Sequence, residues 1–430
     1  MNDSLVGYLM QAPEGNLTFR YDESWLARKD ALPASIMLPL REEPFAGPAV
    51  LAAFDNLLPD SESQRRTISE QVRADGADTF SLLKEIGRDC AGALQFTGED
   101  GQTNQYGVDP AKLDGEPLDA EALELLLQGL PSSPLGLTFR DNFRVSVAGA
   151  QKKTALLFHD NRWFKPGGMT PTTHILKTQI GKLPTGTDLS NSVENEYYCL
   201  KLTEAFGLPV AAAEIHTFGA TRALVVERFD RKRTEDGKIV RLHQEDMCQA
   251  LSIHPSIKYE RQGGPGVVQI LRVLEGSEDP ARDQEIVLKA QLIFWLIGAT
   301  DGHAKNFSIL MESGKRFRLA PLYDILTVEP SIVDGSARGL DPRLAMSVGA
   351  EWQHTIANIE ARHFIETSEE AGLPRKVATR MLEEIAELAP SALAAAEADL
   401  APDVSTQIQE TVNSVVHRRL GKLQHSLRTR

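Results

Sequence analysis

Residues 294–310 read FWLIGATDGHAKNFSIL, and this stretch decides the fold that we expect for the chain. Its apolar beginning is typical of the end of a buried helix, and its last four residues are typical of a short strand. The acid Asp301 and the amide Asn306 lie between these two elements, five positions apart. Polar groups directly after a buried helix are costly unless they have a function. The stretch therefore predicts a functional loop between two buried elements.

The spacing of Asp301 and Asn306 is D-x-x-x-x-N, the spacing of a protein-kinase catalytic loop. In that loop the aspartate accepts or orients the hydroxyl of the substrate, and the asparagine oxygen binds Mg²⁺. Asp324 follows eighteen residues later in the sequence Tyr-Asp-Ile and is a candidate for a second metal ligand, although no Phe-Gly follows it. The alternative is that Asp301 caps a turn and Asn306 satisfies the loop backbone, because the spacing alone is common.

The segments on both sides of this loop predict the layout of a protein kinase. A β-rich module comes first, with strands expected at residues 143–147, 153–158, 172–177, 210–216 and 222–228 and a helix at 190–206. A mostly helical part follows, with helices expected at 244–251, 267–274, 282–297, 375–388, 391–398 and 405–427 and short strands at 307–310 and 317–319. A layout by itself does not establish a function.

Candidates for nucleotide binding lie in the β-rich module. Lys177 ends an apolar strand, where it can bind phosphate, and either Glu194 or Glu196 on the following helix would hold it. The spacing does not decide between these two acids. The turn at residues 146–153, SVAGAQKK, is rich in small residues whose exposed amides can cradle phosphates. The alternatives are a solvated lysine and an ordinary β-hairpin turn.

Two further segments are candidates for ligand contacts. Glu227-Arg-Phe-Asp230 joins the β-rich module to the helical part, which is where kinases read adenine through backbone groups. Its alternative reading is a charged linker with Phe229 packed into the core. The stretch GGPG at residues 263–266 indicates a loop between helices, which we expect to face the substrate.

The composition excludes several classes of protein. The chain has 430 residues and a formal net charge of −14, which argues against binding nucleic acid by bulk charge. The first 139 residues hold 23 acidic and 10 basic side chains, whereas the last fifteen residues are basic. Three cysteines, Cys90, Cys199 and Cys248, lack metal-ligand spacing and favour a reducing compartment. Because neither a signal peptide nor a membrane-spanning run is visible, we expect a cytoplasmic protein.

Ten strings of the sequence, in the right order, closely resemble the HipA family, the serine/threonine kinase toxins of bacterial type II toxin–antitoxin pairs. They are FDNLLPDS at 54–61, EIGRD at 85–89, SVAGAQKKTALL at 146–157, TPTTHILK at 170–177, ENEYYCL at 194–200, VERFDR at 226–231, QEDMCQ at 244–249, GGPG at 263–266, FWLIGATDGHAKNFS at 294–308 and YDI at 323–325. Several are too long to arise by chance, so the resemblance is more specific than any single motif.

The resemblance implies an α+β, bilobed, protein-kinase-like fold with an extra N-terminal β-rich subdomain and a helical C-terminal lobe. The implied parts are the N-terminal subdomain at residues 1–135, a kinase-like N-lobe with the phosphate loop at 136–235, and a helical C-lobe with the catalytic loop at 236–430. The implied activity is that of a non-specific serine/threonine protein kinase, which transfers the γ-phosphate of ATP with the help of Mg²⁺.

The resemblance also implies roles for individual residues. Asp301 would be the catalytic base, and Asn306 and Asp324 would be the metal ligands. The residues in contact with ATP would be Val147, Ala148, Gly149, Ala150, Gln151, Lys177, Glu227, Phe229 and His303. Ser146 would be the autophosphorylation site, where a phosphate of about −1.5 to −2 charges would eject the phosphate loop and inactivate the enzyme. The ordinary reading of Ser146 is a solvent-facing serine on a strand.

The implied partners are a HipB-type helix-turn-helix antitoxin, operator DNA reached mainly through that antitoxin, and a protein substrate. We expect the substrate to be an aminoacyl-tRNA synthetase, with glutamyl-tRNA synthetase as the first candidate. The sequence departs from the family at Lys152, where a glutamate often stands, and at residues 363–373, which carry three glutamates and no lysine or arginine. Relatives can have basic residues there that touch DNA, so we expect the antitoxin to carry this chain to its operator.

Two other functions are compatible with the residues. The first is a co-repressor scaffold that acts through the antitoxin, because the end of the chain is basic and the acidic first third offers a surface for a basic partner. The second is a small-molecule phosphotransferase, because such enzymes use the D-x-x-x-x-N spacing too.

Overall fold

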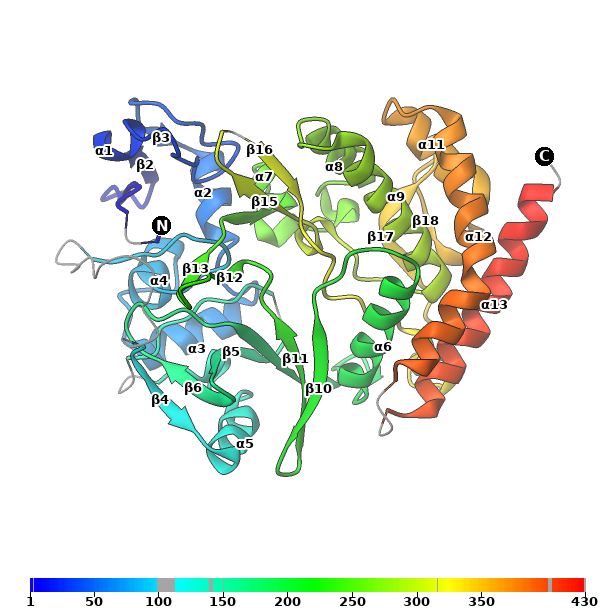
Figure 1. Cartoon of the computed structure of the whole chain (residues 1–430), viewed down its shortest axis with the longest axis horizontal. Coiled ribbons are helices and arrows are strands. Elements are labelled where there is room, and N and C mark those ends of the chain that lie inside the picture. The colour runs from blue at the N-terminus through cyan, green and yellow to red at the C-terminus, as the bar shows by residue number, and fades with distance from the viewer. Residues whose placement is uncertain are drawn as a thin grey trace. The chain divides into compact units, whose positions relative to one another are not determined.

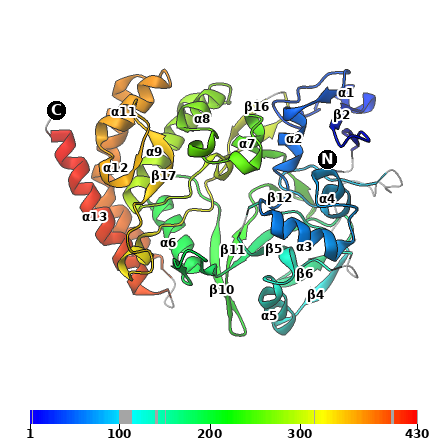
Figure 2. The ribbon, with the colours of Figure 1, turned by 180° about the vertical axis from the view of Figure 1, so that it is seen from behind.

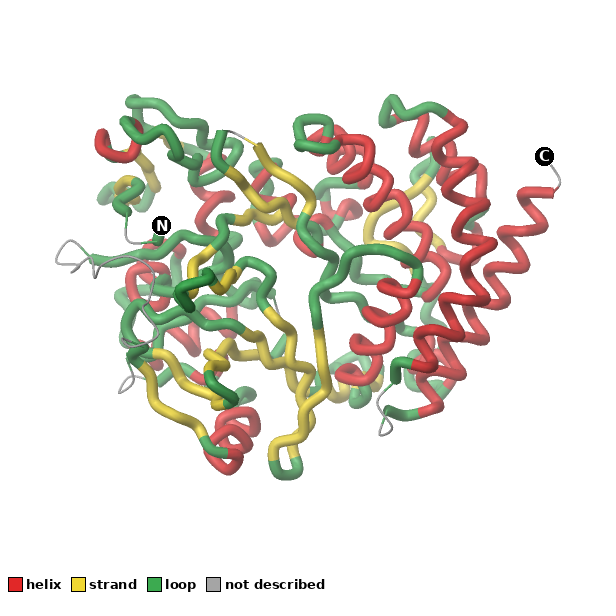
Figure 3. The backbone as a smooth tube through the Cα atoms, viewed as in Figure 1, coloured by secondary structure: helices red, strands yellow, loops and turns green. Residues whose placement is uncertain are grey.

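The computed structural model describes residues 1–2, 4–98, 113–138, 142–149, 151–314, 316–400 and 404–428. It divides into two compact units, each assembled from separate stretches of chain (Figure 1). The first unit contains Met1–Thr178, His216–Ser256 and Ser308–Phe317, and the second contains Gln179–Ile215, Ile257–Phe307 and Arg318–Arg430. Most of the strands belong to the first unit, whereas the longest helices belong to the second (Figure 3).

The N-terminal segment of the first unit contains both strands and helices. Its sheet has the order β1-β2-β3, with the strands Gly7–Gln11, Leu17–Tyr21 and Phe45–Ala46. The accompanying helices are α1 (Glu23–Leu26), α2 (Pro48–Asp55), α3 (Glu62–Val72) and α4 (Thr79–Ile86). Asp22, Ser61 and Asp78 cap α1, α3 and α4, because each side chain accepts a hydrogen bond from a backbone N–H of the first turn.

A six-stranded sheet with the order β10-β11-β7-β5-β6-β4 carries the nucleotide-binding candidates. Its strands are β4 (Gly115–Leu118), β5 (Lys153–His159), β6 (Arg162–Pro166), β7 (His174–Thr178), β10 (Ala213–Phe218) and β11 (Thr221–Glu227). Helix α5 (Ala120–Gly129) is capped by Asp119 and packs against β4 and β11. One core of buried apolar side chains extends from the N-terminal segment into this sheet.

Residues 143–147 do not form the strand that the sequence predicted. The apolar side chains of this segment are buried in the core, and Ser146 between them is buried as well. The amide of Ser146 donates a hydrogen bond to the carbonyl of Asp89 at 2.9 Å, and its hydroxyl donates to the carbonyl of Leu57 at 2.7 Å. The segment is therefore anchored in the interior by contacts with the N-terminal segment, and its alternating pattern does not mark a strand.

Strand structure also replaces the first part of the helix expected at residues 244–251. β14 (Gln244–Asp246) pairs with β15 (Ser308–Glu312), which lies next to β16 (Arg316–Leu319). Asp246 then caps the short helix α7 (Met247–Ala250) by accepting a hydrogen bond from the amide of Gln249. An aspartate in this position favours the start of a helix, so the helix begins only after the strand. A small sheet of β12 (Arg231–Arg233) and β13 (Ile239–Arg241) lies before it in the chain.

The second unit is mainly helical. Its helices are α6 (Ser192–Ala205), α8 (Val267–Leu274), α9 (Pro280–Ile297), α10 (Glu329–Val333), α11 (Ala361–Glu370), α12 (Arg375–Ala398) and α13 (Thr406–Arg428). The strands are β8 (Gly181–Lys182), β9 (Asp188–Leu189), β17 (Arg343–Val348) and β18 (Gln353–Thr355), which form two hairpins. Helices α12 and α13 pack side by side, as the opposite views in Figures 1 and 2 both show. Among the described residues, no helix has the length and the apolar character needed to cross a bilayer.

Helix α12 is continuous where the sequence predicted two helices. Pro390 lies inside it, and a proline removes one backbone hydrogen bond, which is why the sequence favoured a break. The proline lies on the exposed face, while Ile385, Ala389 and Leu393 continue the buried stripe on both sides of it. This buried stripe keeps the helix in one piece across the proline.

Candidate active site

The loop at residues 301–306 is positioned by the buried helix that precedes it. The last turn of α9, from Phe294 to Ile297, is at most 4% exposed, and the helix ends at Gly298, whose φ of 77° is left-handed. Gly302 passes so close to the ring of Phe294 that a Cβ would lie 2.6 Å from it. A 3-10 turn at Ala304–Asn306 completes the loop, and β15 follows. The helix, loop and strand predicted from this stretch are confirmed.

Asn306 supports the loop through the backbone of Asp301. Its side-chain Nδ2 donates a hydrogen bond to the carbonyl of Asp301 at 2.8 Å, and its backbone N–H donates to the carbonyl of His303 at 2.9 Å. The alternative role of Asn306 in satisfying the backbone is therefore real. That role uses the side-chain nitrogen and does not use the oxygen, which is the atom that could bind a metal.

The carboxylate of Asp301 is half exposed, which suits a group that must meet a substrate. Its side chain is 53% exposed, whereas that of His303 is 3% exposed. Oδ1 of Asp301 accepts a hydrogen bond from the hydroxyl of Tyr259 at 2.5 Å and lies 3.9 Å from Nε2 of His303. A carboxylate has room for further donors at its second oxygen. Asp301 can therefore accept a hydrogen bond from a hydroxyl group that enters from solvent.

Asp324 follows a tyrosine that contacts the same loop. The hydroxyl of Tyr323 donates a hydrogen bond to the carbonyl of Lys305 at 3.0 Å. Ile325 on the other side is 1% exposed, so both neighbours of Asp324 are anchored. Asp324 itself has a φ of 60°, in the left-handed region that aspartate tolerates better than most residues. Left-handed residues other than glycine occur often at functional sites.

The chemistry of these donors fits a magnesium ion. Mg²⁺ prefers oxygen ligands and is commonly held by one or two carboxylates together with the phosphates of a substrate. Asn306 offers an amide oxygen and Asp324 a carboxylate. The part of the chain that the structure describes has no group of three or more His, Cys, Asp or Glu side chains arranged around a metal position. The phosphates of a bound nucleotide would supply further oxygen ligands to such an ion.

The candidate phosphate loop lies in the first unit. The structure describes it up to Gly149 and again from Gln151, whereas Ala150 lies outside the described residues. Gly149 has a φ of 97°, a conformation that favours glycine. Gln151 donates a hydrogen bond to the carbonyl of Thr178 at 3.2 Å, which attaches the far end of the loop to the end of β7. Because residues 142–149 contain no strand, the interpretation as a β-hairpin turn is wrong.

Two buried lysines lie next to this loop. Lys153 of β5 and Lys177 of β7 are directly opposite in the sheet, and each is 6% exposed. Nζ of Lys153 donates a hydrogen bond to the carbonyl of Ala148 at 2.7 Å. The burial of Lys177 excludes the interpretation as a solvated lysine. Because directly opposite side chains point to the same face of the sheet, both lysines extend to the face from which they can bind an anion such as a polyphosphate.

The hinge candidate at residues 227–230 alternates between outward and inward side chains. Glu227 is exposed and Phe229 is half buried, so Phe229 is not the core residue of the alternative interpretation. Arg228 and Asp230 are 5% and 2% exposed. The amide of Arg228 donates a hydrogen bond to the carbonyl of Thr173 at 2.9 Å. The inward side chains fix this segment, and the outward ones stay accessible to a ligand.

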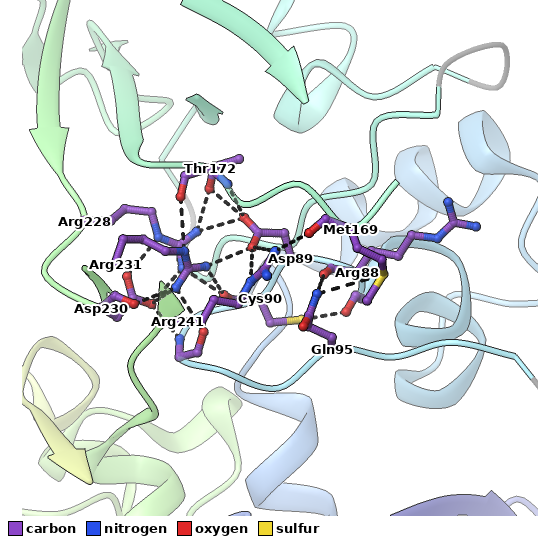
Figure 4. Close-up of polar contacts among 12 residues, drawn as sticks. Arg88, Asp89, Cys90, Gln95, Met169, Thr172, Arg228, Asp230, Arg231 and Arg241 are labelled. Carbon is purple, nitrogen blue, oxygen red and sulfur yellow. Dashed lines mark hydrogen bonds and ion pairs between the residues drawn. The ribbon is translucent and has the colours of Figure 1, made fainter. Parts of the chain in front are cut away.

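A buried ionic cluster holds the hinge candidate in place (Figure 4). The Asp89 cluster consists of Asp89, Asp230, Arg228, Arg231 and Arg241. Oδ1 of Asp89 accepts hydrogen bonds from Arg231 at 3.0 Å and from Arg241 at 2.8 Å. Arg228 binds Asp230 through Nε and Nη2, at 3.0 and 2.8 Å. The amide and the hydroxyl of Thr172 donate to the other oxygen of Asp89, so the cluster also fixes the chain that leads into β7.

The charges of the Asp89 cluster stay ionised despite their burial. Burial alone would raise the pKa of Asp89, but the guanidiniums of Arg231, Arg241 and Arg228 outweigh it and hold the pKa well below its usual range. Asp230 is under the same opposing influences, and the guanidiniums lower its pKa to about 2. Three cations face two anions, and burial together with the neighbouring Arg228 lowers the pKa of Arg231 to about 10.

The two acids considered as partners of Lys177 both lie on α6. Glu194 accepts a hydrogen bond from Nε2 of Gln179 at 2.8 Å, and Glu196 is 1% exposed. Both acids belong to the second unit and Lys177 belongs to the first. Which of them pairs with Lys177 stays a prediction.

Sequence reasoning missed Tyr259 and Asp89, and it assigned no role to the side chain of Lys153. A signal for Lys153 was present, because it begins one apolar strand while Lys177 ends the next, which is the register of an antiparallel pair. Tyr259 lies 42 residues from its partner Asp301, and Asp89 lies 152 residues from Arg241. No local sequence pattern predicts a contact between residues that are so far apart in the chain.

Known proteins resemble this chain along most of its length. Residues 145–393 match the family model of the HipA-like C-terminal domain, and residues 1–97 match that of the HipA N-terminal domain. A protein of Sinorhizobium fredii named putative kinase Y4mE is 36% identical over 388 residues, which are 89% of this chain and 88% of that protein. The serine/threonine-protein kinase toxin HipA of Shewanella oneidensis is 27% identical over 408 residues, covering 92% of this chain and 87% of the relative.

The fold also resembles a solved structure. The HipA chain in a complex of Shewanella oneidensis HipA, HipB and operator DNA superposes with a TM-score of 0.81, over 100% of this chain and 97% of the other, at 24% identity. This likeness confirms the predicted fold class of mixed helices and sheets.

Proposed function

Because the chain belongs to the HipA family, we propose that it is an ATP-dependent serine/threonine protein kinase that acts as the toxin of a toxin–antitoxin pair. The observation that carries this proposal is Asp301, a half-exposed carboxylate on a loop that a buried helix and Asn306 hold in place. A carboxylate that is exposed in this way can accept the proton of a substrate hydroxyl. The relatives named as kinases support the same activity.

The proposal assigns a task to each part of the two candidate sites. Asp301 accepts or orients the substrate hydroxyl, and Asn306 and Asp324 are the ligands for Mg²⁺, which neutralises charge on the phosphates when it is bound. The phosphates of ATP are bound by Lys177 and the loop 147–151, to which we add Lys153 because it lies opposite Lys177. Adenine contacts the backbone at Glu227 and Phe229, and His303 lies near the phosphates. The division into parts at 1–135, 136–235 and 236–430 belongs to the same proposal.

Autophosphorylation at Ser146 would require the segment around it to move. The hydroxyl of Ser146 has no exposure and donates to the carbonyl of Leu57, so a kinase cannot reach it in this conformation. A phosphate ester cannot donate that hydrogen bond, and its charge would face the carbonyl oxygen of Leu57. Phosphorylation would therefore keep the segment, and with it the phosphate loop, out of its place. This is a physical route to self-inactivation.

The partners that we propose are a HipB-type antitoxin, operator DNA through that antitoxin, and an aminoacyl-tRNA synthetase as the substrate. The complex formed by the structural relative contains HipA, HipB and operator DNA, which supports the first two. The acidic first third of this chain is a candidate surface for the antitoxin. Glutamyl-tRNA synthetase is the first protein substrate to test.

The test of the activity is the transfer of labelled phosphate. The purified full chain is incubated with γ-labelled ATP and Mg²⁺, alone and with glutamyl-tRNA synthetase, and the labelled residues are mapped by mass spectrometry. We expect label on Ser146 and its loss in Ser146→Ala. Ser368→Ala is the matched control, because Ser368 is likewise 0% exposed but lies on α11.

Three outcomes separate the possible functions. Label on protein supports a protein kinase, and label only on added metabolites would favour a small-molecule phosphotransferase. No label on either, together with tighter operator binding by the antitoxin when this chain is present, would favour the co-repressor scaffold.

A further inference from the structure

The glycine-rich stretch at residues 263–266 forms a turn that contacts the backbone of Tyr259. The amide of Gly264 donates a hydrogen bond to the carbonyl of Tyr259 at 3.0 Å. Gly263 has a φ of 93°, in the region that favours glycine. A Cβ on Gly264 would collide with the carbonyl oxygen of Ile257. The stretch therefore needs its glycines in order to form this turn, which holds the backbone of Tyr259 in place.

The residue after Tyr259 anchors the turn to the hairpin β17–β18. Oε2 of Glu260 accepts a hydrogen bond from the amide of Ser347 at 2.5 Å and lies 3.5 Å from Nε2 of His354. The side chain of Glu260 is only 13% exposed, so this anchor is largely shielded from water. Gly266 leaves room for it, because a Cβ there would collide with the Glu260 carboxylate. The position of Tyr259 is thus fixed from both sides.

The turn and the Glu260 anchor place the hydroxyl of Tyr259 next to the carboxylate of Asp301. The hydroxyl donates its hydrogen bond to Oδ1 at 2.5 Å. The ring of Tyr259 stands edge-on to the ring of His303, with their centres 4.8 Å apart and their planes at 85°. Because His303 is 3% exposed and lies in the same loop as Asp301, its ring is a fixed surface against which the ring of Tyr259 packs. All of these residues belong to the second unit, so the arrangement does not depend on the first.

We propose that Tyr259 is a positioning residue for Asp301, and that the stretch at residues 263–266 exists to hold Tyr259 in that position. The inference rests on the proposed kinase function and adds to it a residue that positions the proposed catalytic base. By occupying Oδ1, Tyr259 restricts rotation of the carboxylate and presents Oδ2 to the incoming hydroxyl. Positioning of this kind contributes to rate because a small misplacement of a base costs a large factor.

In the reaction, Tyr259 keeps its own proton. The oxygen of the substrate hydroxyl forms a bond to the γ-phosphorus of ATP, the bond from that phosphorus to the bridging oxygen breaks, and ADP leaves with the electron pair. The hydroxyl proton passes to Oδ2 of Asp301. Removal of the Tyr259 hydroxyl should therefore slow this step without weakening the binding of ATP.

The geometry has one competing reading, in which Tyr259 blocks the base by occupying the place of the substrate hydroxyl. The anchored turn argues against it, because a gate must open and Tyr259 is fixed by Gly264 and Glu260. The exposure of Asp301 argues in the same direction, since 53% of its side chain is accessible with Tyr259 in place. The two readings predict opposite signs for the same substitution.

The experiment compares Tyr259→Phe with the wild-type full chain. The rate of phosphate incorporation into the chain is measured over a range of ATP concentrations, giving a maximal rate and the ATP concentration at half of that rate. We expect the maximal rate to fall about tenfold, with the half-saturating ATP concentration unchanged. Gly266→Ala, which displaces Glu260, should lower the maximal rate in the same way. The thermal midpoint of each variant is recorded beside the kinetics.

Two control variants isolate the effect of position. Tyr8→Phe removes another tyrosine hydroxyl that donates to an aspartate, Asp22, at 3.1 Å, and it should leave both kinetic constants unchanged. Gly421→Ala adds a methyl group in open space on α13 and should do the same. An unchanged or raised maximal rate in Tyr259→Phe would overturn the inference while labelling by the wild type still supports the kinase. A wild type that incorporates no label would count against the kinase function itself.

Discussion

Asp89 and Asp301 are both aspartates, but their burial and their hydrogen-bond partners differ. The side chain of Asp89 is 4% exposed and meets three guanidiniums, whereas that of Asp301 is 53% exposed and accepts a hydrogen bond from Tyr259. The oxygens of Asp89 are already engaged by arginines and by Thr172, so this acid can only fix the chain. Asp301 keeps acceptor capacity for a ligand. A buried acid with many donors is a structural support, and a half-exposed acid with one donor is able to react.

The largest effect on stability should come from breaking the Asp89 cluster. Asp89→Asn removes one of two negative charges among three buried arginines and should lower the free energy of unfolding by about 3–5 kcal/mol. Urea denaturation followed by tryptophan fluorescence measures the change. Asp75→Asn is the control, because Asp75 forms its ion pair with Lys84 at the surface and should change the stability little. Equal effects of the two variants would show that the cluster is not a support.

Glu245 sharpens the comparison, because it is a buried acid without an arginine. Burial, reinforced by the neighbouring Asp246, raises the pKa of Glu245 to about 7. Its contribution to stability is present below pH 4.5 and is lost as the pH rises toward 7, since the folded state binds the proton more tightly. Glu245→Gln should remove this loss, so its stability relative to the wild type should improve by about 3 kcal/mol between pH 4 and pH 8.

The pH dependence of Glu245→Gln is read from urea denaturation of both proteins at each pH. Glu62→Gln serves as the control, since the side chain of Glu62 is 86% exposed and should leave the difference flat across this range. A difference between Glu245→Gln and the wild type that is equally flat would contradict the assignment of a buried, protonated carboxyl.

A smaller effect is expected where the loop at residues 301–306 contacts the helix α9. In Gly302→Ala the new Cβ would lie 2.6 Å from the ring of Phe294, so the loop or the ring must shift. We expect a loss of about 1–3 kcal/mol of stability together with a reduced rate of phosphate transfer. Thermal unfolding and phosphate labelling measure the two effects, with Gly129→Ala as a control because no atom lies within 4 Å of the position that its new methyl group would take. Full activity in Gly302→Ala would show that the loop tolerates this shift.

The smallest effect on stability should come from Asp301 itself. Asp301→Asn keeps the shape of a half-exposed side chain and should leave the thermal midpoint nearly unchanged. The measurement is a thermal scan beside the wild type, with Asp89→Asn scanned in the same series. A large drop in the midpoint of Asp301→Asn would place Asp301 with the structural acids and remove the contrast between the two.

The fold around the loop at residues 301–306 could be predicted because its sequence signals are local. The apolar helix, the polar loop and the strand follow one another within residues 294–310, and the structure contains each of them. The errors arose where tertiary contacts decide. Residues 143–147 alternate like a strand but are anchored in the interior by contacts with the N-terminal segment, and Pro390 fits inside a helix because a buried stripe continues past it.

The candidate site could be predicted only in the parts that a motif contains. Asp301, Asn306 and Asp324 belong to such motifs. The contacts of Tyr259 and of the Asp89 cluster join residues that are remote in sequence. The sequence around a tyrosine or an arginine does not predict which distant residue it contacts. The burial of Ser146 was equally invisible, because it depends on carbonyl groups of Leu57 and Asp89 in the N-terminal segment.

The most direct test of the account is the phosphate transfer by Asp301→Asn. The variant, the wild type and the control Asp341→Asn, whose side chain is 52% exposed, are incubated with γ-labelled ATP and Mg²⁺, and the initial rates of labelling are compared. We predict that Asp301→Asn is slower by about 10²–10⁴-fold, that it remains folded, and that Asp341→Asn equals the wild type. Labelling by Asp301→Asn at the wild-type rate would contradict the assignment of Asp301 as the base.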